Sequence, residues 1–205
     1  ILEVAYFYKR VAVAHEPDTT KVIERLGEIH PTFLVSVPRV LEKVYNSAAA
    51  KAENAGGAKA KIFKAAVQTA IDYSKALENG GRPSAALKVK QKLYSKLVYS
   101  KLREALGGEC DCAVSGGAPL GTRLGHFFRG IGVTILEGYG LTETTAPATV
   151  NLPDKVKIGT VGPPLPGVSV RIGEDGEILI KGLNVLRGYH DNESATADAI
   201  RDGWF

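Results

Sequence analysis

The side chains best suited to bind a ligand or take part in a reaction lie in one stretch of the 205-residue chain. It runs from Gly138 to Thr144 and reads Gly-Tyr-Gly-Leu-Thr-Glu-Thr. Tyr139 offers an aromatic face between two glycines, and the Thr142 hydroxyl can donate to a phosphate oxygen. Glu143 supplies a hard carboxylate oxygen, a ligand that suits Mg²⁺ beside substrate phosphates. Because a bare carboxylate would repel phosphates, the pattern predicts a cation between them. A glycine-rich turn with a solvated Glu143 and a core Tyr139 is the alternative interpretation.

A second glycine-rich segment, residues 115–120, reads Ser-Gly-Gly-Ala-Pro-Leu. Neither segment matches the phosphate-loop pattern or the dinucleotide-binding fingerprint. Small residues let a main chain approach a flat heterocycle or a phosphate closely. Ligands in open α/β sheets bind outside the carboxyl ends of the strands. We therefore expect both segments to be loops that follow consecutive strands of a parallel sheet.

The surrounding elements predict such a sheet. Apolar runs predict strands at 11–14, 32–37, 110–115 and 133–136. Helices are expected between them: one capped by Asp18 that carries Val22, Ile23, Leu26 and Ile29 on one face, one with Pro38 in its first turn, and one over 120–128. The strand at 32–37 is expected to be buried. The fold class is α/β, with a layered, mostly parallel sheet covered by helices.

Residues 39–106 are rich in Ala, Lys and Leu and predict a helical insertion of three helices. The last helix, about 83–106, gathers an apolar arc of Val89, Leu93, Tyr94, Leu97, Val98 and Leu102. Between Lys88 and Arg103 there are six basic residues and no acidic one. A solvated face whose apolar side packs on the domain is the favoured interpretation. Weak contact with acidic lipid remains an alternative. No aromatic residue is interleaved with the lysines as a base-stacking platform, which argues against nucleic acid.

Beyond Asn151 short strands replace helices. Asp175-Gly176 separates strands at 169–172 and 177–180 and predicts a hairpin, and Asn192 is expected to cap a final helix. We place a boundary so that residues 1–155 form the α/β part and residues 156–205 begin a smaller β-rich subdomain.

Composition excludes several classes of protein. Hydrophobic residues make up 44% and charged residues 23%, and the net charge is +4, which argues against a disordered, membrane-spanning or strongly nucleic-acid-binding chain. Cys110 and Cys112, the only cysteines, are predicted to be a reduced structural pair, which points to the cytoplasm. The opening residues show no secretory signal. Because the chain begins at Ile1 and contains no Met, we expect it to be a piece of a longer protein.

Four stretches in order resemble the motifs of the adenylate-forming superfamily, which includes acyl-CoA synthetases and peptide-synthetase adenylation domains. They are residues 115–120, 135–144, the proline-rich 159–167, and 176–182 continuing to 187–189. Together with residues 37–44 and the helical insertion, they look most like a bacterial long-chain fatty acyl-CoA synthetase. The resemblance covers essentially the whole chain.

The resemblance implies that a fatty acid is activated by ATP to an acyl-adenylate and then transferred to coenzyme A. Residue by residue, it places Gly117, Ala118 and Pro119 along the adenine, and Tyr139 against its ring. It places Gly138, Gly140 and Leu141 on the floor of the site, Thr142 at the α-phosphate and Glu143 on Mg²⁺, and makes Thr142 and Glu143 the catalytic pair. Arg187, Gly188 and Tyr189 are implied to be structural.

Several parts of the family's pattern are missing from these 205 residues. They include the Lys-bearing phosphate loop, the ribose-binding Asp and the C-terminal domain with its Lys, so we expect the isolated chain to be inactive. Two other functions stay open: an enzyme that delivers the acyl group to a carrier protein, and a catalytically silent nucleotide-binding module. The sequence does not predict the acyl chain length or the oligomeric state.

Overall fold

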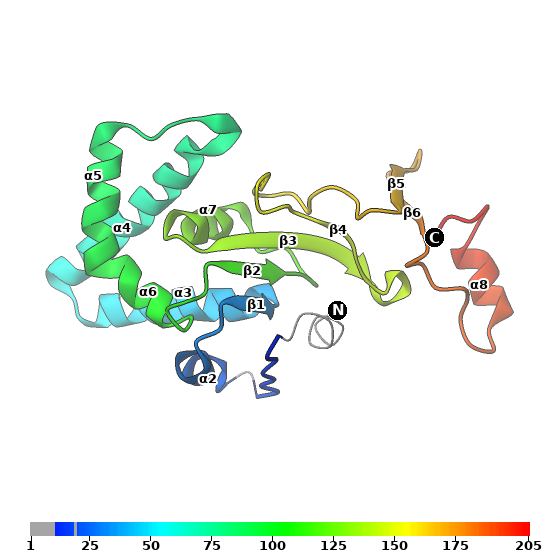
Figure 1. The fold of residues 1–205 in the computed structure, drawn as a ribbon, viewed down its shortest axis with the longest axis horizontal. Helices are drawn as coiled ribbons and strands as arrows, with labels where there is room; N and C mark the ends of the chain where they lie inside the picture. Colours follow the sequence, from blue (N-terminus) through cyan, green and yellow to red (C-terminus); the bar gives the residue numbers. More distant parts are fainter. Residues whose placement is uncertain (1–10, 19) are drawn as a thin grey trace.

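The computed structural model describes residues 11–18 and 20–205 and shows an α/β chain (Figure 1). The helices of this part are α2 (Val22–Ile29), α3 (Pro38–Asn54), α4 (Gly57–Ala76), α5 (Ala85–Tyr94), α6 (Ser100–Glu104), α7 (Thr122–Gly130) and α8 (Glu193–Ala199). The strands are β1 (Phe33–Ser36), β2 (Cys112–Ser115), β3 (Thr134–Leu141), β4 (Ala146–Val150), β5 (Val168–Ile172) and β6 (Ile178–Gly182). Shorter helical segments are the 3₁₀ helices η1 (Glu78–Gly80) and η3 (Thr142–Thr144) and the π helix η2 (Ser95–Tyr99).

The predicted fold class is confirmed. Strands β1 to β4 form one sheet in that order, with β1, β2 and β3 parallel and β4 antiparallel to β3. The helices that connect the parallel strands lie beside this sheet, and α3 to α6 gather at one end of the molecule (Figure 1). Strands β5 and β6 form a separate antiparallel pair towards the other end, near α8 (Figure 1).

The prediction that residues 32–37 form a buried strand is wrong in its burial. Strand β1 is present, but Phe33 and Val35 are exposed while Leu34 packs against the core. Burial alternates along β1, so the described chain covers the face that carries Leu34 and leaves the face of Phe33 and Val35 open. Pro38 begins α3 as predicted, where its missing N–H costs no helical hydrogen bond.

Two further predictions near the start of the chain are wrong. Residues 11–14 are irregular and mostly exposed, because no strand in the described part of the chain pairs with them. Asp18 does not cap α2: its carboxylate accepts hydrogen bonds from the Thr20 N–H (2.9 Å) and hydroxyl (2.6 Å), which turns the chain before the helix starts at Val22. Ile29 at the end of α2 is exposed, so the packed stripe stops at Leu26.

The helical insertion has the three predicted helices, and the third is a continuous run of α5, η2 and α6. Tyr99 is fully buried there, and its hydroxyl donates to the Ala66 carbonyl oxygen in α4 at 2.7 Å. The apolar arc of this third helix is only partly packed. Leu102 is buried, whereas Val89, Leu93 and Leu97 are exposed, so the prediction that the whole arc faces the domain is wrong. The described helices cover only the inner part of the arc.

Helix α7 is held against α4 by close backbone contact. A Cβ added to Gly130 would lie 2.0 Å from the Ala70 carbonyl oxygen, so only glycine allows the two helices to approach this far. Nearby, His126 is buried, and its Nδ1 lies 3.1 Å from the hydroxyl oxygen of Ser74. Burial lowers the pKa of the imidazole. These contacts fix the helix that follows the first glycine-rich segment.

The C-terminal elements follow the sequence prediction closely. Asp175-Gly176 forms the turn between β5 and β6, with the Glu177 N–H bonded to the Asp175 carboxylate at 3.0 Å. The Asn192 side chain caps α8 by accepting from the Ala195 N–H at 3.1 Å. The subdomain boundary between residues 155 and 156 stays a prediction.

The cysteines are unpaired, as predicted. Burial raises the pKa of the Cys110 thiol to about 11 and also raises that of Cys112. In the described part of the chain, none of the helices combines the length and apolar character needed to span a bilayer.

Candidate nucleotide site

The two glycine-rich segments lie side by side at the carboxyl-terminal end of the parallel part of the sheet. Ser36, Ser115 and Glu137 are aligned across β1, β2 and β3. A Cβ added to Gly116 would lie 3.7 Å from the carbonyl oxygen of Gly138, which follows Glu137 in β3. The expectation that the two segments belong to neighbouring parallel strands is therefore confirmed.

Residues 116–120 leave β2 as an open loop. Gly117 adopts a positive φ of 82°, a conformation that glycine takes without strain, and Gly117, Ala118 and Pro119 are all exposed. The loop ends where the N–H of buried Leu120 donates to the Glu137 carboxylate at 3.0 Å. Glu137 is itself buried, so this charged side chain anchors the first segment to the start of the second.

The second segment is not a loop over its whole length, and this part of the prediction is wrong. Strand β3 continues through Leu141, because β4 pairs with it along Gly138 to Leu141. The glycines permit this pairing: a Cβ on Gly140 would lie 1.9 Å from the Ala146 carbonyl oxygen, and one on Gly138 would lie 2.9 Å from the Thr149 carbonyl oxygen. Glycine weakens a strand in isolation, but here it makes room for a neighbouring backbone.

The extension of β3 separates the aromatic residue from the polar pair. Tyr139 is half-buried in the strand, whereas Thr142 and Glu143 lie in the turn beyond it, in η3. At roughly 3.3 Å per residue, Thr142 lies about 10 Å further along the chain than Tyr139. The base and the phosphate of a nucleotide are separated by a comparable distance.

Thr144 holds the turn together. It is fully buried, and its hydroxyl accepts from the Leu141 N–H at 2.8 Å and donates to the Ala146 carbonyl oxygen at 2.8 Å. Thr145 and Ala146 follow with φ of 53° and 76°, which residues other than glycine adopt only at an energetic cost. The Thr144 hydrogen bonds offset that cost and keep Thr142 and Glu143 at the tip.

A distant segment, residues 183–189, packs on this turn through four hydrogen bonds. Asn184 makes two of them. Its carbonyl oxygen accepts from the Thr145 hydroxyl at 2.8 Å, and its side-chain amide donates to the Thr144 carbonyl oxygen at 3.1 Å. The Leu186 N–H donates to the Glu143 carbonyl oxygen at 2.7 Å. The fourth reaches the Glu143 side chain itself.

That fourth bond runs from the Tyr189 hydroxyl to Glu143 Oε1, at 3.1 Å. Desolvation, followed by this hydrogen bond, raises the pKa of the Tyr189 phenol, so the phenol is a stable donor at neutral pH. The other carboxylate oxygen of Glu143, Oε2, makes no hydrogen bond within the described residues. Glu143 is thus oriented by one partner and keeps one oxygen for a further ligand.

The donor set fits a magnesium ion that is held mainly by a substrate. Within residues 11–18 and 20–205, no three His, Cys, Asp or Glu side chains gather where they could enclose a metal. Mg²⁺ commonly binds through one or two carboxylates together with waters and substrate phosphates. A single oriented carboxylate, that of Glu143, meets that requirement.

The sequence did not single out Glu137, Thr144, Asn184 or Tyr189 as partners of the site. Tyr189 lies 46 positions from Glu143, and nothing in the local spacing of either residue indicates the contact. Asn151 is a further missed residue: it is buried, its backbone N–H donates to the Glu137 carbonyl oxygen at 2.9 Å, and its Oδ1 accepts from the Lys157 N–H at 3.0 Å. It ties the end of β4 and the following proline-rich segment to β3.

A family model for the AMP-binding enzymes matches residues 7–190. The chain belongs to the AMP-binding enzyme family. It is 52% identical over 204 residues to the long-chain-fatty-acid–CoA ligase FadD15 of Mycobacterium bovis, a match that covers 100% of this chain and 34% of the relative. It is 36% identical over 202 residues to long chain acyl-CoA synthetase 4 of Arabidopsis thaliana, covering 91% of this chain and 29% of that protein.

A solved AMP-binding-fold structure supports the architecture. The o-succinylbenzoate CoA synthetase MenE from Bacillus subtilis, in complex with an acyl-adenylate intermediate, superposes with a TM-score of 0.61 at 19% identity, covering 100% of this chain and 33% of that one. This likeness shows the fold. The chain spans about a third of the length of the relatives that it matches. The roles of the individual site residues in this AMP-binding chain stay predictions.

Proposed function

We propose that the full-length protein that contains this chain is a long-chain fatty acid–CoA ligase. The observation that carries the proposal is the arrangement along β3, where a half-buried Tyr139 is followed at nucleotide length by Thr142 and an oriented Glu143. Family membership supports nucleotide binding, and the two curated relatives, both named for long-chain acids, support the class of substrate.

In this proposal Gly117, Ala118 and Pro119 line one side of the adenine and Tyr139 lies against its ring. The exposed loop and its positive φ at Gly117 support close approach of a flat base. Gly138, Gly140 and Leu141 shape the floor of the same site. The half-buried Tyr139 can provide aromatic contact area at low entropic cost.

The chemistry would begin at the α-phosphate. A carboxylate oxygen of the fatty acid attacks phosphorus, the bond to the β-phosphate oxygen breaks, and pyrophosphate leaves. The Thr142 hydroxyl donates to an α-phosphate oxygen, and Glu143 holds Mg²⁺, which when bound neutralises charge on the phosphates. In the second step the thiol of coenzyme A loses its proton to solvent and its sulfur attacks the acyl carbon, the bond from that carbon to the AMP phosphate oxygen breaks, and AMP leaves.

We infer the cytoplasm as the compartment, because both cysteines of the chain are unpaired thiols. The proposed partners are the fatty acid, ATP and coenzyme A. Nucleic acid is not among them, since the two aromatic side chains within the basic stretch of the third helix, Tyr94 and Tyr99, pack in the core and are not presented for bases to stack on.

The test is fatty-acid-dependent exchange of pyrophosphate into ATP by the full-length protein. Replacing Glu143→Gln keeps the shape of the side chain and removes its charge, so we expect the exchange rate to fall by about 100-fold or more. Glu174→Gln is the matched control, because Glu174 is exposed in the distant β5–β6 turn. Near-normal exchange by Glu143→Gln would refute the metal role. Acyl transfer to a carrier-protein thiol in preference to coenzyme A would instead favour the carrier-dependent enzyme.

A further inference from the structure

Residues 201–205 extend the small antiparallel sheet of β5 and β6. Ile180 in β6 and Phe205 exchange both of their backbone hydrogen bonds, at 2.7 and 2.9 Å. This exchange is the pattern of directly opposite residues in antiparallel strands. Arg201 and Trp204 exchange bonds in the same way, at 2.8 and 2.9 Å, across a tight turn. The sheet therefore continues beyond β6 through two further short segments of backbone.

This register brings three basic side chains to one face of the extended sheet. Opposite residues in antiparallel strands share a face, and so do residues two apart along one strand. Because Ile180 is opposite Phe205, Lys181 is opposite Trp204, which is in turn opposite Arg201. Arg171 lies two positions after the partner of Lys181 in β5. All three basic side chains are exposed. We call the surface made by Arg171, Lys181, Arg201 and Trp204 the Trp204 face.

The Trp204 ring holds two of these cations close together. The guanidinium carbon of Arg171 lies 4.5 Å from the ring centroid, and the ammonium nitrogen of Lys181 lies 5.9 Å from it. Two positive charges this near each other repel, and the negative π face of the ring offsets part of that repulsion. Among the described residues, no carboxylate forms an ion pair with Arg171, Lys181 or Arg201. The face therefore attracts an anion.

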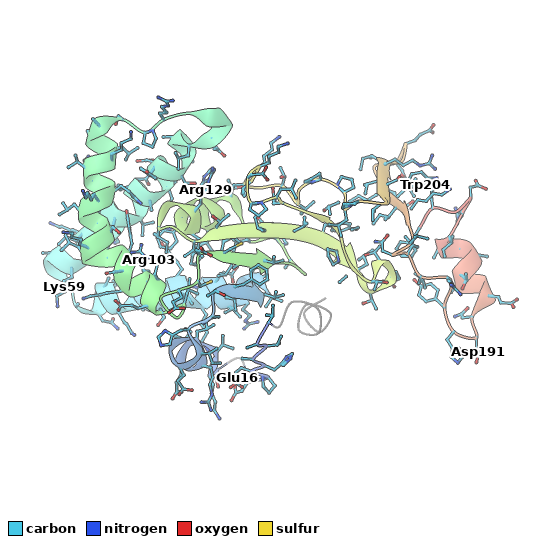
Figure 2. All side chains as sticks on the ribbon, viewed as in Figure 1. Glu16, Lys59, Arg103, Arg129, Asp191 and Trp204 are labelled. Carbon is cyan, nitrogen blue, oxygen red and sulfur yellow. The ribbon has the colours of Figure 1, made fainter. Side chains whose placement is uncertain are left out.

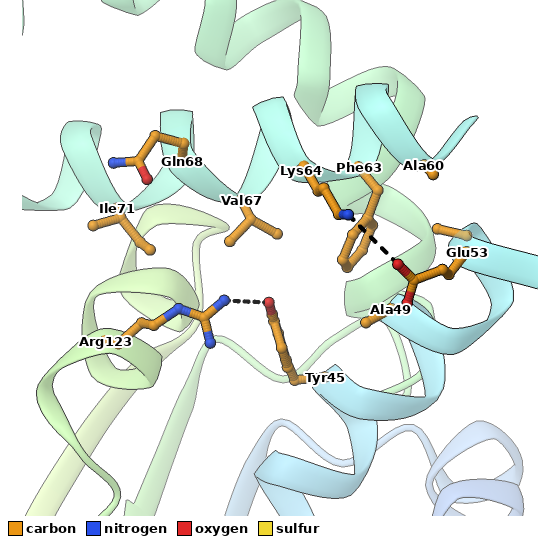
Figure 3. A pocket seen from close by; sticks show the side chains of 11 residues that line it. Tyr45, Ala49, Glu53, Ala60, Phe63, Lys64, Val67, Gln68, Ile71 and Arg123 are labelled. Atoms are coloured by element: carbon orange, nitrogen blue, oxygen red, sulfur yellow. Dashed lines mark hydrogen bonds and ion pairs between the residues drawn. The ribbon is translucent and has the colours of Figure 1, made fainter. Parts of the chain in front are cut away.

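A second arginine that lies over an aromatic ring makes a useful contrast. Arg123 lies 5.0 Å from the centroid of Tyr45, at one end of a hollow of about 340 Å³ (Figure 3). It donates to the Tyr45 hydroxyl at 2.5 Å, so the side chain that stacks on it also accepts from it. Tryptophan has a ring N–H and no acceptor atom. Arg171 makes no hydrogen bond to any described residue, so its N–H groups are left for another acceptor.

The Trp204 face is separate from the candidate nucleotide site but close to it along the chain. Trp204 lies at the opposite end of the molecule from Lys59 and Arg103 of the helical insertion (Figure 2). Lys181 precedes Asn184 by three residues, about 10 Å of extended backbone. The Asn184 amide donates to the Thr144 carbonyl oxygen, in the turn that also carries the candidate metal ligand. A ligand on this face is therefore near that turn without occupying it.

We propose that the Trp204 face is a binding site for a phosphate group. The oxygens of a phosphate can accept two parallel bonds from one guanidinium edge and a further bond from an ammonium beside it. A nucleic-acid base fits less well, because Arg171 already lies over the Trp204 ring on which a base would stack. Two ligands share the required chemistry, the 3′-phosphate of coenzyme A and free pyrophosphate. The first rests on the proposed function, and the second does not.

The test is isothermal titration calorimetry of the full-length protein, without ATP or fatty acid. The probes are coenzyme A, 3′-dephospho-coenzyme A and pyrophosphate. Arg171→Gln with Lys181→Gln removes two charges, so we expect a phosphate held by this face to bind at least about tenfold more weakly. If coenzyme A is the ligand, the wild type binds it more tightly than the dephosphorylated probe, and the variant binds both alike. If pyrophosphate is the ligand, only its affinity falls in the variant. Either result supports the site.

Matched variants separate this site from a general effect of charge. Lys88→Gln with Lys92→Gln removes the same charge from exposed positions of α5, and this variant should bind all three probes like the wild type. Arg171→Lys keeps the charge and loses the planar fork, so its affinity should be intermediate. Melting temperatures check that each variant is folded. Because calorimetry needs no turnover, failure of the exchange assay would refute the ligase proposal and leave this site to be judged by binding alone.

Three results would overturn the proposal. The first is equal affinity of the wild type and of the Arg171→Gln, Lys181→Gln variant for every probe. The second is an equal loss in the α5 control, which would show a general effect of net charge. The third is loss of binding to a polyglutamate peptide with no change for any phosphate probe, because that would assign the face to an acidic polypeptide.

Discussion

Gly140→Ala tests the reason why β3 carries the polar pair beyond the end of its parallel neighbours. The added methyl group would lie 1.9 Å from the Ala146 carbonyl oxygen and 2.8 Å from the Pro147 Cα, both backbone atoms of the β4 side. Reaching an ordinary contact of 3.4 Å requires β4 to move away by about 1.5 Å. A displacement of that size breaks nearby ladder hydrogen bonds.

The expected magnitude follows from opposing contributions. Overpacking costs about 1–3 kcal/mol and each lost hydrogen bond about 1 kcal/mol. Gly140 is not in the left-handed region, so alanine recovers about 0.4–1 kcal/mol by restricting the unfolded chain. The steric cost wins, and we expect local destabilisation of about 3 kcal/mol.

The assay is hydrogen exchange of the full-length protein, followed by mass spectrometry of peptides from residues 134–150. About 3 kcal/mol corresponds to roughly a hundredfold faster exchange of the amides that open locally. Nucleotide affinity, measured by calorimetry, should fall in the same variant because the tip of β3 carries Thr142 and Glu143.

Gly27→Ala is the matched control for this substitution. Gly27 lies inside α2 with no atom within 4 Å of an added Cβ, so alanine should stabilise that helix by up to about 1 kcal/mol. Wild-type exchange at residues 134–150 together with wild-type nucleotide affinity in Gly140→Ala would refute the close approach of β4 to β3.

Two further predictions concern single side chains. Tyr189→Phe removes the hydrogen bond to Glu143 but keeps the ring, so the magnesium concentration needed for half-maximal exchange should rise by about tenfold or less. An unchanged magnesium dependence would show that Tyr189 does not orient the carboxylate. Cys110 should resist alkylation at pH 8, because its raised pKa of about 11 keeps the thiol protonated. The folded state then holds this proton more tightly than the unfolded state, so the stabilising contribution is complete below about pH 9 and is lost as pH rises through 11. Mass spectrometry after iodoacetamide treatment checks the alkylation, and melting temperatures between pH 8 and 11 check the stability. Rapid labelling of Cys110 at pH 8 would contradict the burial.

Local chemistry made some elements predictable. The Pro38 start of α3, the Asp175-Gly176 turn and the Asn192 cap each depend on a residue whose backbone or side-chain preference acts within a few positions. Asp18 shows the limit of this reasoning. Its carboxylate has two local uses, a helix cap or a turn, and the structure uses the turn.

Burial was less predictable than secondary structure. The periodicity of Val89, Leu93 and Leu97 correctly indicates one helical face, yet these side chains are exposed because the described helices cover only the neighbouring part of the arc. Phe33 and Val35 are exposed for a related reason, since no described element packs on the face of β1 that carries them. A pattern says which side chains share a face, and the neighbours decide whether that face is covered.

The amino-acid order is enough to indicate the functional groups of the site, which are an aromatic ring, a hydroxyl and a carboxylate within five residues. It also indicates that they come after a strand that follows another glycine-rich segment. The length of β3 and the partners of Glu143 needed the folded chain. They depend on β4 closing against Gly140 and on Tyr189 arriving from 46 positions away. Such contacts form because packing brings remote backbone together, and the intervening sequence leaves no local trace of them.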